Sequence, residues 1–75
     1  MTQKELSYLE DAITHEESIV KICQETIKNL SNESLISFMN SEVDSHNSLK
    51  EKLLSVLEEK ANEWQTTYGK LSISS

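Results

Sequence analysis

The chain has 75 residues, a length that allows one small domain and buries only about 60% of the unfolded surface when it folds. It contains no proline and a single glycine, a composition typical of a helical protein and not of a strand-and-turn protein. The formal net charge of −6 argues against binding to nucleic acid or to an acidic membrane, because such binding needs clustered Lys and Arg.

The first predicted element is a helix over about residues 3–29. Thr2 and Glu5 have the spacing of a capping box, which marks a helix start. The residues after it form a stripe with steps of three and four, the pattern of a helix that packs against a neighbour. The stripe comprises Leu6, Leu9, Ile13, Glu16, Val20, Cys23, Ile27 and Leu30. Its only charged member is Glu16, and it is widened on one side by Ala12, Ile19 and Ile22.

A short turn over about residues 30–32 leads into the second predicted helix. Ser31 or Asn32 can cap this helix, and Glu33 falls in its first turn, where an acidic side chain suits the helix dipole. The polar stretch between the two apolar patterns is brief, as in a tight helix–helix connection.

The second helix is predicted over about residues 33–67. Its stripe comprises Leu35, Ile36, Met39, Val43, His46, Leu49, Leu53, Val56, Leu57, Ala61 and Trp64. Gly69 is a natural C-terminal stop, and we expect residues 69–75 to form a frayed tail. Residues 1–75 thus make a single helical-hairpin domain.

Two amphipathic helices joined by a short loop form an antiparallel hairpin, so the predicted fold class is all-α. If the turn centres near Ser31, Glu16 and His46 lie at the same height and face each other. A hairpin alone would leave wide apolar faces in water, and we expect two copies to pair as a homodimer into a four-helix bundle. A monomer is the alternative. The interface residues we expect are Leu53, Leu57, Ala61, Trp64 and Tyr68.

Glu16 and His46 would form a polar layer inside the hairpin, and Glu42 is four residues before His46 on nearly the same helix face. We favour a hydrogen-bonded layer that fixes the pairing of the helices. One alternative is an iron or zinc site with Glu16, Glu42 and His46 as ligands, because imidazole and carboxylate suit these metals. Di-iron bundles use Glu-x-x-His, however, and Val43 occupies the position three before His46. A pH-sensitive layer is the other alternative.

Other reactive side chains have simpler interpretations. Cys23 lies among apolar residues and is expected to pack in the core, since no cation on its face would stabilise a thiolate. His15 lies beside the stripe and is expected at the surface. Glu17 precedes Lys21 by four residues, the favoured order for an ion pair within one helix, but we expect a solvated face here. No catalytic triad or phosphate-binding loop occurs in the sequence.

The stretch from Glu5 to Leu57 resembles the small ferritin-like helical proteins of spore-forming bacteria, the group around spore coat protein F. The resemblance lies in "LEDAITHEE", "SNESL" and "EVDSHNSL". It implies a ferritin-like helical fold and a location in the cytoplasm or the spore coat. In metal-binding members of the ferritin-like class, Glu16 and His46 would correspond to the first and last ligands, whereas Val43 stands where a second Glu is expected.

Three functions follow from these observations. The first is a non-enzymatic structural or interaction protein, a homodimer linked to sporulation or the spore coat, with other coat proteins as further partners and no cofactor. The second is a metal-binding bundle, for which ferroxidase-like activity stays open. The third is a regulatory adaptor that docks a partner helix near Trp64 and Tyr68. No apolar run has the length of a signal peptide or a membrane span, so we expect a cytoplasmic protein that binds neither membrane nor nucleic acid.

Overall fold

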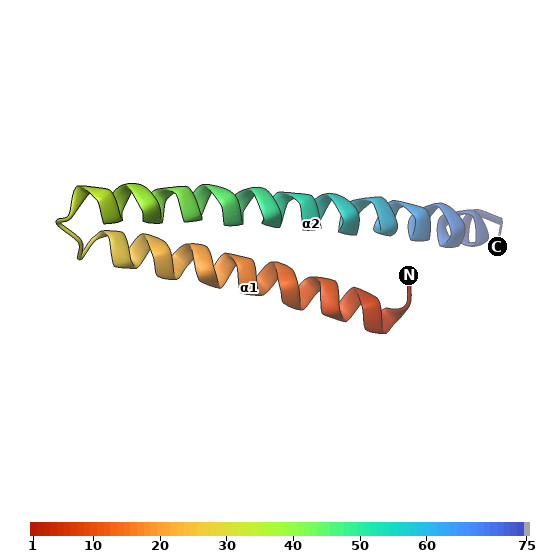
Figure 1. Cartoon of the computed structure of the whole chain (residues 1–75). Helices are drawn as coiled ribbons and strands as arrows, with labels where there is room; N and C mark the ends of the chain where they lie inside the picture. Colours follow the sequence, from red (N-terminus) through yellow and green to blue (C-terminus); the bar gives the residue numbers. More distant parts are fainter. Residues whose placement is uncertain (75) are drawn as a thin grey trace.

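The structure, a computed structural model, describes the backbone of residues 1–74 and the side chains of residues 1–60. Over residues 1–74 it consists of two α-helices without any strand: α1 spans Gln3–Ile27 and α2 spans Glu33–Ser74. The helices run in opposite directions side by side, joined by a short connection at one end (Figure 1). The prediction of an all-α helical hairpin is confirmed.

Both helices begin at side-chain caps. The backbone N–H of Glu5 donates to Thr2 Oγ1 at 3.0 Å, and the backbone N–H of Thr2 donates to Glu5 Oε1 at 2.9 Å. This is the reciprocal capping box that the sequence predicts. At the start of α2, the backbone N–H of Leu35 donates to Asn32 Oδ1 at 3.0 Å. Of the two candidate caps, Asn32 is therefore the one that forms this bond.

The ends of the helices differ from the expected boundaries. Helix α1 ends at Ile27, slightly before the expected residue 29, and the chain turns with a bond from the Leu30 N–H to the Ile27 carbonyl. Helix α2 continues to Ser74, so residues 69–74 are helical where we expected a frayed tail. A single glycine costs a helix only about 1 kcal/mol, and Gly69 does not end this one.

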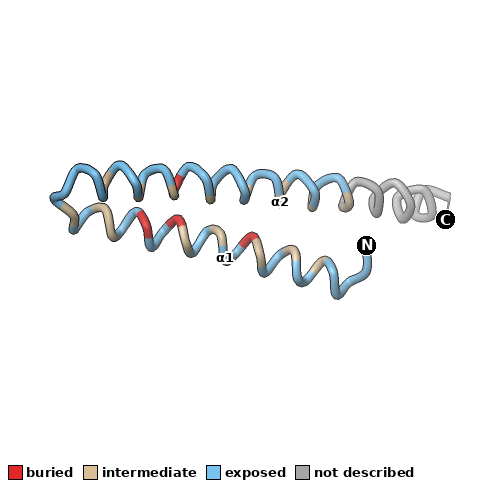
Figure 2. Tube along the Cα trace, viewed as in Figure 1, coloured by how far each residue is buried: buried red, intermediate tan, exposed pale blue. Residues whose placement is uncertain are grey.

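The core is a narrow line of apolar side chains between the helices. The buried members are Ile13, Val20, Cys23 and Val43 (Figure 2). Val20, Cys23 and Val43 form one cluster, and three partly buried residues pack against it, namely Ile19, Ile27 and Met39. Cys23 is buried, as its surroundings in the sequence predict.

The hairpin is long and thin. Its extents are 62 × 17 × 15 Å and its radius of gyration is 17.9 Å, whereas a compact domain of this length has a radius of about 11 Å. Its accessible surface is 5868 Å², against about 4,700 Å² for a folded monomer of this mass. More surface therefore remains in contact with water than in a typical folded domain.

The second helix buries a narrower stripe than its sequence suggests. Leu35, Leu49 and Val56, all members of the predicted stripe, are exposed. Lys50 is half-buried instead, because it follows Val43 by seven residues and so lies on the side that faces α1. A single neighbouring helix covers only one seam, and the predicted stripe is wider than that seam.

Candidate functional site

The two ionisable residues of the seam meet between the helices. Glu16 comes from the middle of α1 and His46 from α2, and the Nδ1 atom of His46 lies 2.5 Å from Glu16 Oε2. The Glu16 side chain is 13% exposed and that of His46 is 26% exposed, so both are largely covered by the hairpin. The structure thus brings together the two residues whose equal distance from the turn suggested a pair.

Glu42 completes this layer from the side. Its Oε2 atom lies 3.5 Å from His46 Nε2, one turn along α2, and its side chain is more exposed than that of Glu16. Each ring nitrogen of His46 therefore faces a carboxylate oxygen. Only a protonated imidazole can donate from both nitrogens, so the geometry suits the charged form of His46.

The electrostatics agree with this arrangement. The hydrogen bond to Glu16 is the main influence that raises the pKa of His46 above its ordinary value. Partial burial opposes that rise, whereas the negative charges of Glu16 and Glu42 add to it. We call Glu16, Glu42 and His46 the polar layer. Its imidazole therefore binds a proton more readily than that of a free histidine.

The structure contains an ion pair next to the polar layer that was not predicted from the sequence. Lys50 Nζ lies 3.3 Å from Glu17 Oε2, across the two helices. From the sequence, Glu17 and Lys21 have the spacing of an ion pair within α1, but a solvated face is the favoured interpretation. Lys50 is half-buried beside the seam, and its long side chain reaches Glu17. The spacing in the sequence could have indicated this position, because Lys50 follows the stripe residue Val43 by seven residues. The pair thus joins α1 to α2 beside the polar layer.

The polar layer holds the residue types of a metal site, but their arrangement is that of hydrogen-bonded ions. Among the side chains of residues 1–60, no group of three or more His, Cys, Asp and Glu is placed so that it could hold a metal ion. A metal ligand must be a neutral imidazole with a free nitrogen, and both nitrogens of His46 already face carboxylates. Metal binding would therefore require a rearranged layer.

The expected interface residues fall into two groups. Leu53 and Leu57 are half-buried, and their spacing from Val43 and Lys50 places them in the seam toward α1. The side chains of Ala61, Trp64 and Tyr68 lie outside the described residues. Up to residue 60, the large apolar side chains that α2 exposes are others, namely Leu35, Phe38, Leu49 and Val56.

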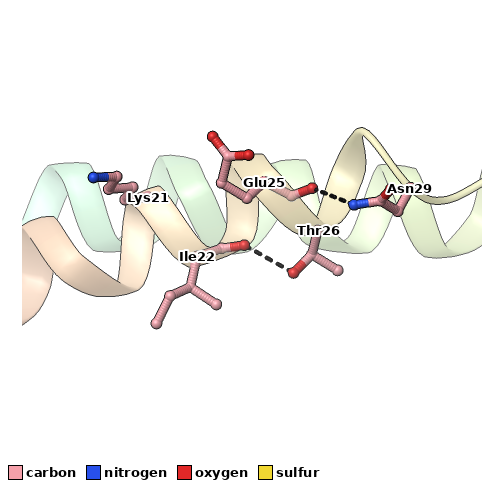
Figure 3. A pocket seen from close by; sticks show the side chains of 5 residues that line it. All are labelled: Lys21, Ile22, Glu25, Thr26 and Asn29. Carbon is pink, nitrogen blue, oxygen red and sulfur yellow. Dashed lines mark hydrogen bonds between the residues drawn. The ribbon is translucent and has the colours of Figure 1, made fainter.

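A shallow hollow lies on the outside of α1 near the turn (Figure 3). It is lined by Lys21, Ile22, Glu25, Thr26 and Asn29. Thr26 Oγ1 donates to the Ile22 carbonyl at 2.8 Å, and Asn29 Nδ2 donates to the Glu25 carbonyl at 3.1 Å. These polar side chains are thus bound to the backbone of their own helix, which leaves Ile22 as the apolar feature of the hollow.

Comparison of the chain with protein-family models, with curated proteins and with solved structures gave no match. In the described part of the chain, no helical segment is both long enough and apolar enough to cross a lipid bilayer.

Proposed function

We propose that the chain is a non-enzymatic structural protein, a helical hairpin that pairs with a second copy of itself into a ferritin-like four-helix bundle. The observation that carries this proposal is the excess surface. The chain exposes 5868 Å², about 1,200 Å² more than a folded monomer of its mass, and among residues 1–60 its seam buries four hydrophobic residues. A second hairpin can cover this surface with helices of the same length and repeat.

The polar layer supports a structural role. Both nitrogens of His46 are engaged by carboxylates, and Glu16 is held between the helices. The thiol of Cys23 is buried in the seam. His46, Glu16 and Cys23 thus take part in the contact between α1 and α2, where they help to define how the helices pair.

We extend the proposal to a role in sporulation or the spore coat, in the cytoplasm or in the coat itself, with other coat proteins as partners. Its support is the resemblance of the stretches around Glu16, Asn32 and His46 to the spore coat protein F group. A fluorescent fusion followed through sporulation tests this part, and a signal that stays diffuse and never reaches the forespore surface would contradict it.

The pairing is tested by sedimentation equilibrium of the purified chain at micromolar concentrations. The expected mass is twice that of the 8.6 kDa chain. A single species with the mass of one chain across the whole concentration range would refute the dimer, and with it the four-helix bundle.

A metal-binding bundle is the second candidate. The residue types of Glu16, Glu42 and His46 suit it, and the layer would have to rearrange to bind an ion. A second copy would supply three more donors of the same kind. Protein purified without chelator would then contain Fe or Zn, and His46→Ala would lose it. Metal analysis that finds neither, before and after incubation with each ion, would remove this candidate.

A further inference from the structure

Among residues 1–60, the large apolar side chains that the helices expose follow a simple rule. There are six of them: Tyr8, Ile22, Leu35, Phe38, Leu49 and Val56. Each directly precedes a residue that is buried or half-buried in the seam; these seam residues are Leu9, Cys23, Ile36, Met39, Lys50 and Leu57. One step along an α-helix turns about 100°, so all six lie to the same side of the seam on their own helix.

The six side chains share one broad face of the hairpin. Two antiparallel helices are related by an approximate two-fold axis perpendicular to the plane that contains both helix axes. This rotation exchanges α1 and α2 and keeps each broad face on its own side. Residues that precede the seam on α1 and on α2 therefore point to the same broad face, which we call the apolar face and define by these six residues.

The opposite broad face has the reverse character. The residues that directly follow the same six seam positions are Glu10, Gln24, Ser37, Asn40, Glu51 and Glu58. All six are polar and exposed, and three are acidic. Two copies of a chain with a net charge of −6 would repel each other across this second face. The hairpin thus offers one face that favours contact with another hairpin and one that opposes it.

We propose that a second copy of the chain docks on the apolar face, through Tyr8, Phe38, Leu49 and Val56 of both copies. This inference rests on the proposed pairing and names the surface that forms it. Leu35, Leu49 and Val56 recur at multiples of seven residues, a repeat that packs against another helix. The chain itself consists of helices with this repeat, so a copy of it matches the face.

The available area agrees with a partner of this size. A standard interface covers about 800 Å² on each partner, and the chain as a whole, counted over both faces and both ends, exposes about 1,200 Å² beyond the surface of a typical folded monomer. Phe38, which is 59% exposed, and Tyr8 can anchor such an interface, because aromatic side chains bury the most area per residue. Two acids, Glu5 and Glu42, also directly precede seam residues on this side. Glu42 has His46 beside it and Glu5 accepts from the Thr2 backbone N–H, which reduces the repulsion they add between the copies.

Phe38 and Asn40 provide a matched test, since they flank the same seam residue, Met39, on opposite faces. Phe38→Glu places a charge on the apolar face, and Asn40→Glu places the same charge on the polar face. The dimer dissociation constant is measured by sedimentation equilibrium. We expect Phe38→Glu to raise it about thirtyfold or more, and Asn40→Glu to change it less than about threefold.

The outcomes separate the two proposals. A wild-type chain that is monomeric overturns the pairing itself. A wild-type dimer that Phe38→Glu leaves intact, or that Asn40→Glu weakens as much, overturns the apolar face and leaves the pairing standing. Circular dichroism confirms that each variant is helical. If Phe38→Glu loses its helices, Phe38→Ala serves instead. We expect it to raise the dissociation constant about tenfold, and an unchanged dissociation constant would refute docking on the apolar face.

Discussion

Two isoleucines of α1 allow a matched test of how narrow the core is. Ile13 is 7% exposed in the seam, whereas Ile22 is 63% exposed. Replacement by Ala removes three carbons from either side chain, and each carbon contributes about 0.8 kcal/mol to the free energy of unfolding when fully buried. Multiplied by the buried fraction of each residue, the lost contribution is about 2.2 kcal/mol for Ile13→Ala and about 0.9 kcal/mol for Ile22→Ala. The higher helix propensity of alanine offsets about 0.4 kcal/mol of this loss in both variants.

The expected decreases in unfolding free energy are therefore about 2 kcal/mol for Ile13→Ala and about 0.5 kcal/mol for Ile22→Ala. A cavity left at Ile13 would enlarge the first value, toward the range of about 2–5 kcal/mol seen for buried residues. Urea unfolding followed by circular dichroism measures both, at a dilution where the chain is monomeric. Equal losses, or a larger loss for Ile22→Ala, would refute a core that lies only between α1 and α2.

Three further predictions concern the polar contacts. Because the pKa of folded His46 is raised, the stability that its protonation adds is complete below its ordinary value of 6.5 and is lost as the pH rises through the higher folded value. The urea midpoint should fall over that rise, and His46→Gln should remove the fall. Thr2→Ala should cost about 1 kcal/mol by removing the capping box, measured by urea unfolding, whereas Thr14→Ala, within α1, should not destabilise. Glu17→Gln should cost less than about 1 kcal/mol, and this cost should vanish in high salt, because the pair with Lys50 is partly exposed.

The hairpin and the contact at its centre were accessible from the sequence because each rests on a local rule. The capping box at Thr2 needs only two residues at fixed spacing. A short connection leaves little freedom in register, so equal distances from the turn predict that Glu16 meets His46. The structure places their side-chain atoms 2.5 Å apart. Local chemistry and chain geometry thus determined both the fold and the residues of the polar layer.

The width of the apolar pattern was harder to interpret. Leu35, Leu49 and Val56 repeat with the period of a buried stripe, yet the hairpin leaves them exposed. The apolar pattern of a sequence marks every surface whose burial is favourable. It does not say whether the same chain or another molecule covers that surface. The cross-helix pair of Glu17 with Lys50 was missed for a related reason: it depends on a long side chain that crosses the seam.

The polar layer also bears on which helices pack together. The stripes of α1 and α2 are both apolar and share a heptad repeat, so packing of α1 against the α1 of another chain competes with the hairpin. In a contact between two α1 helices in matching register, Glu16 would face a second Glu16, and in one between two α2 helices, protonated His46 would face a second imidazolium. Only α1 against α2 brings the carboxylate to the imidazole, as the structure has it. We infer that the layer selects the hairpin over contacts between like helices, and thereby leaves the apolar face free for a folded second copy.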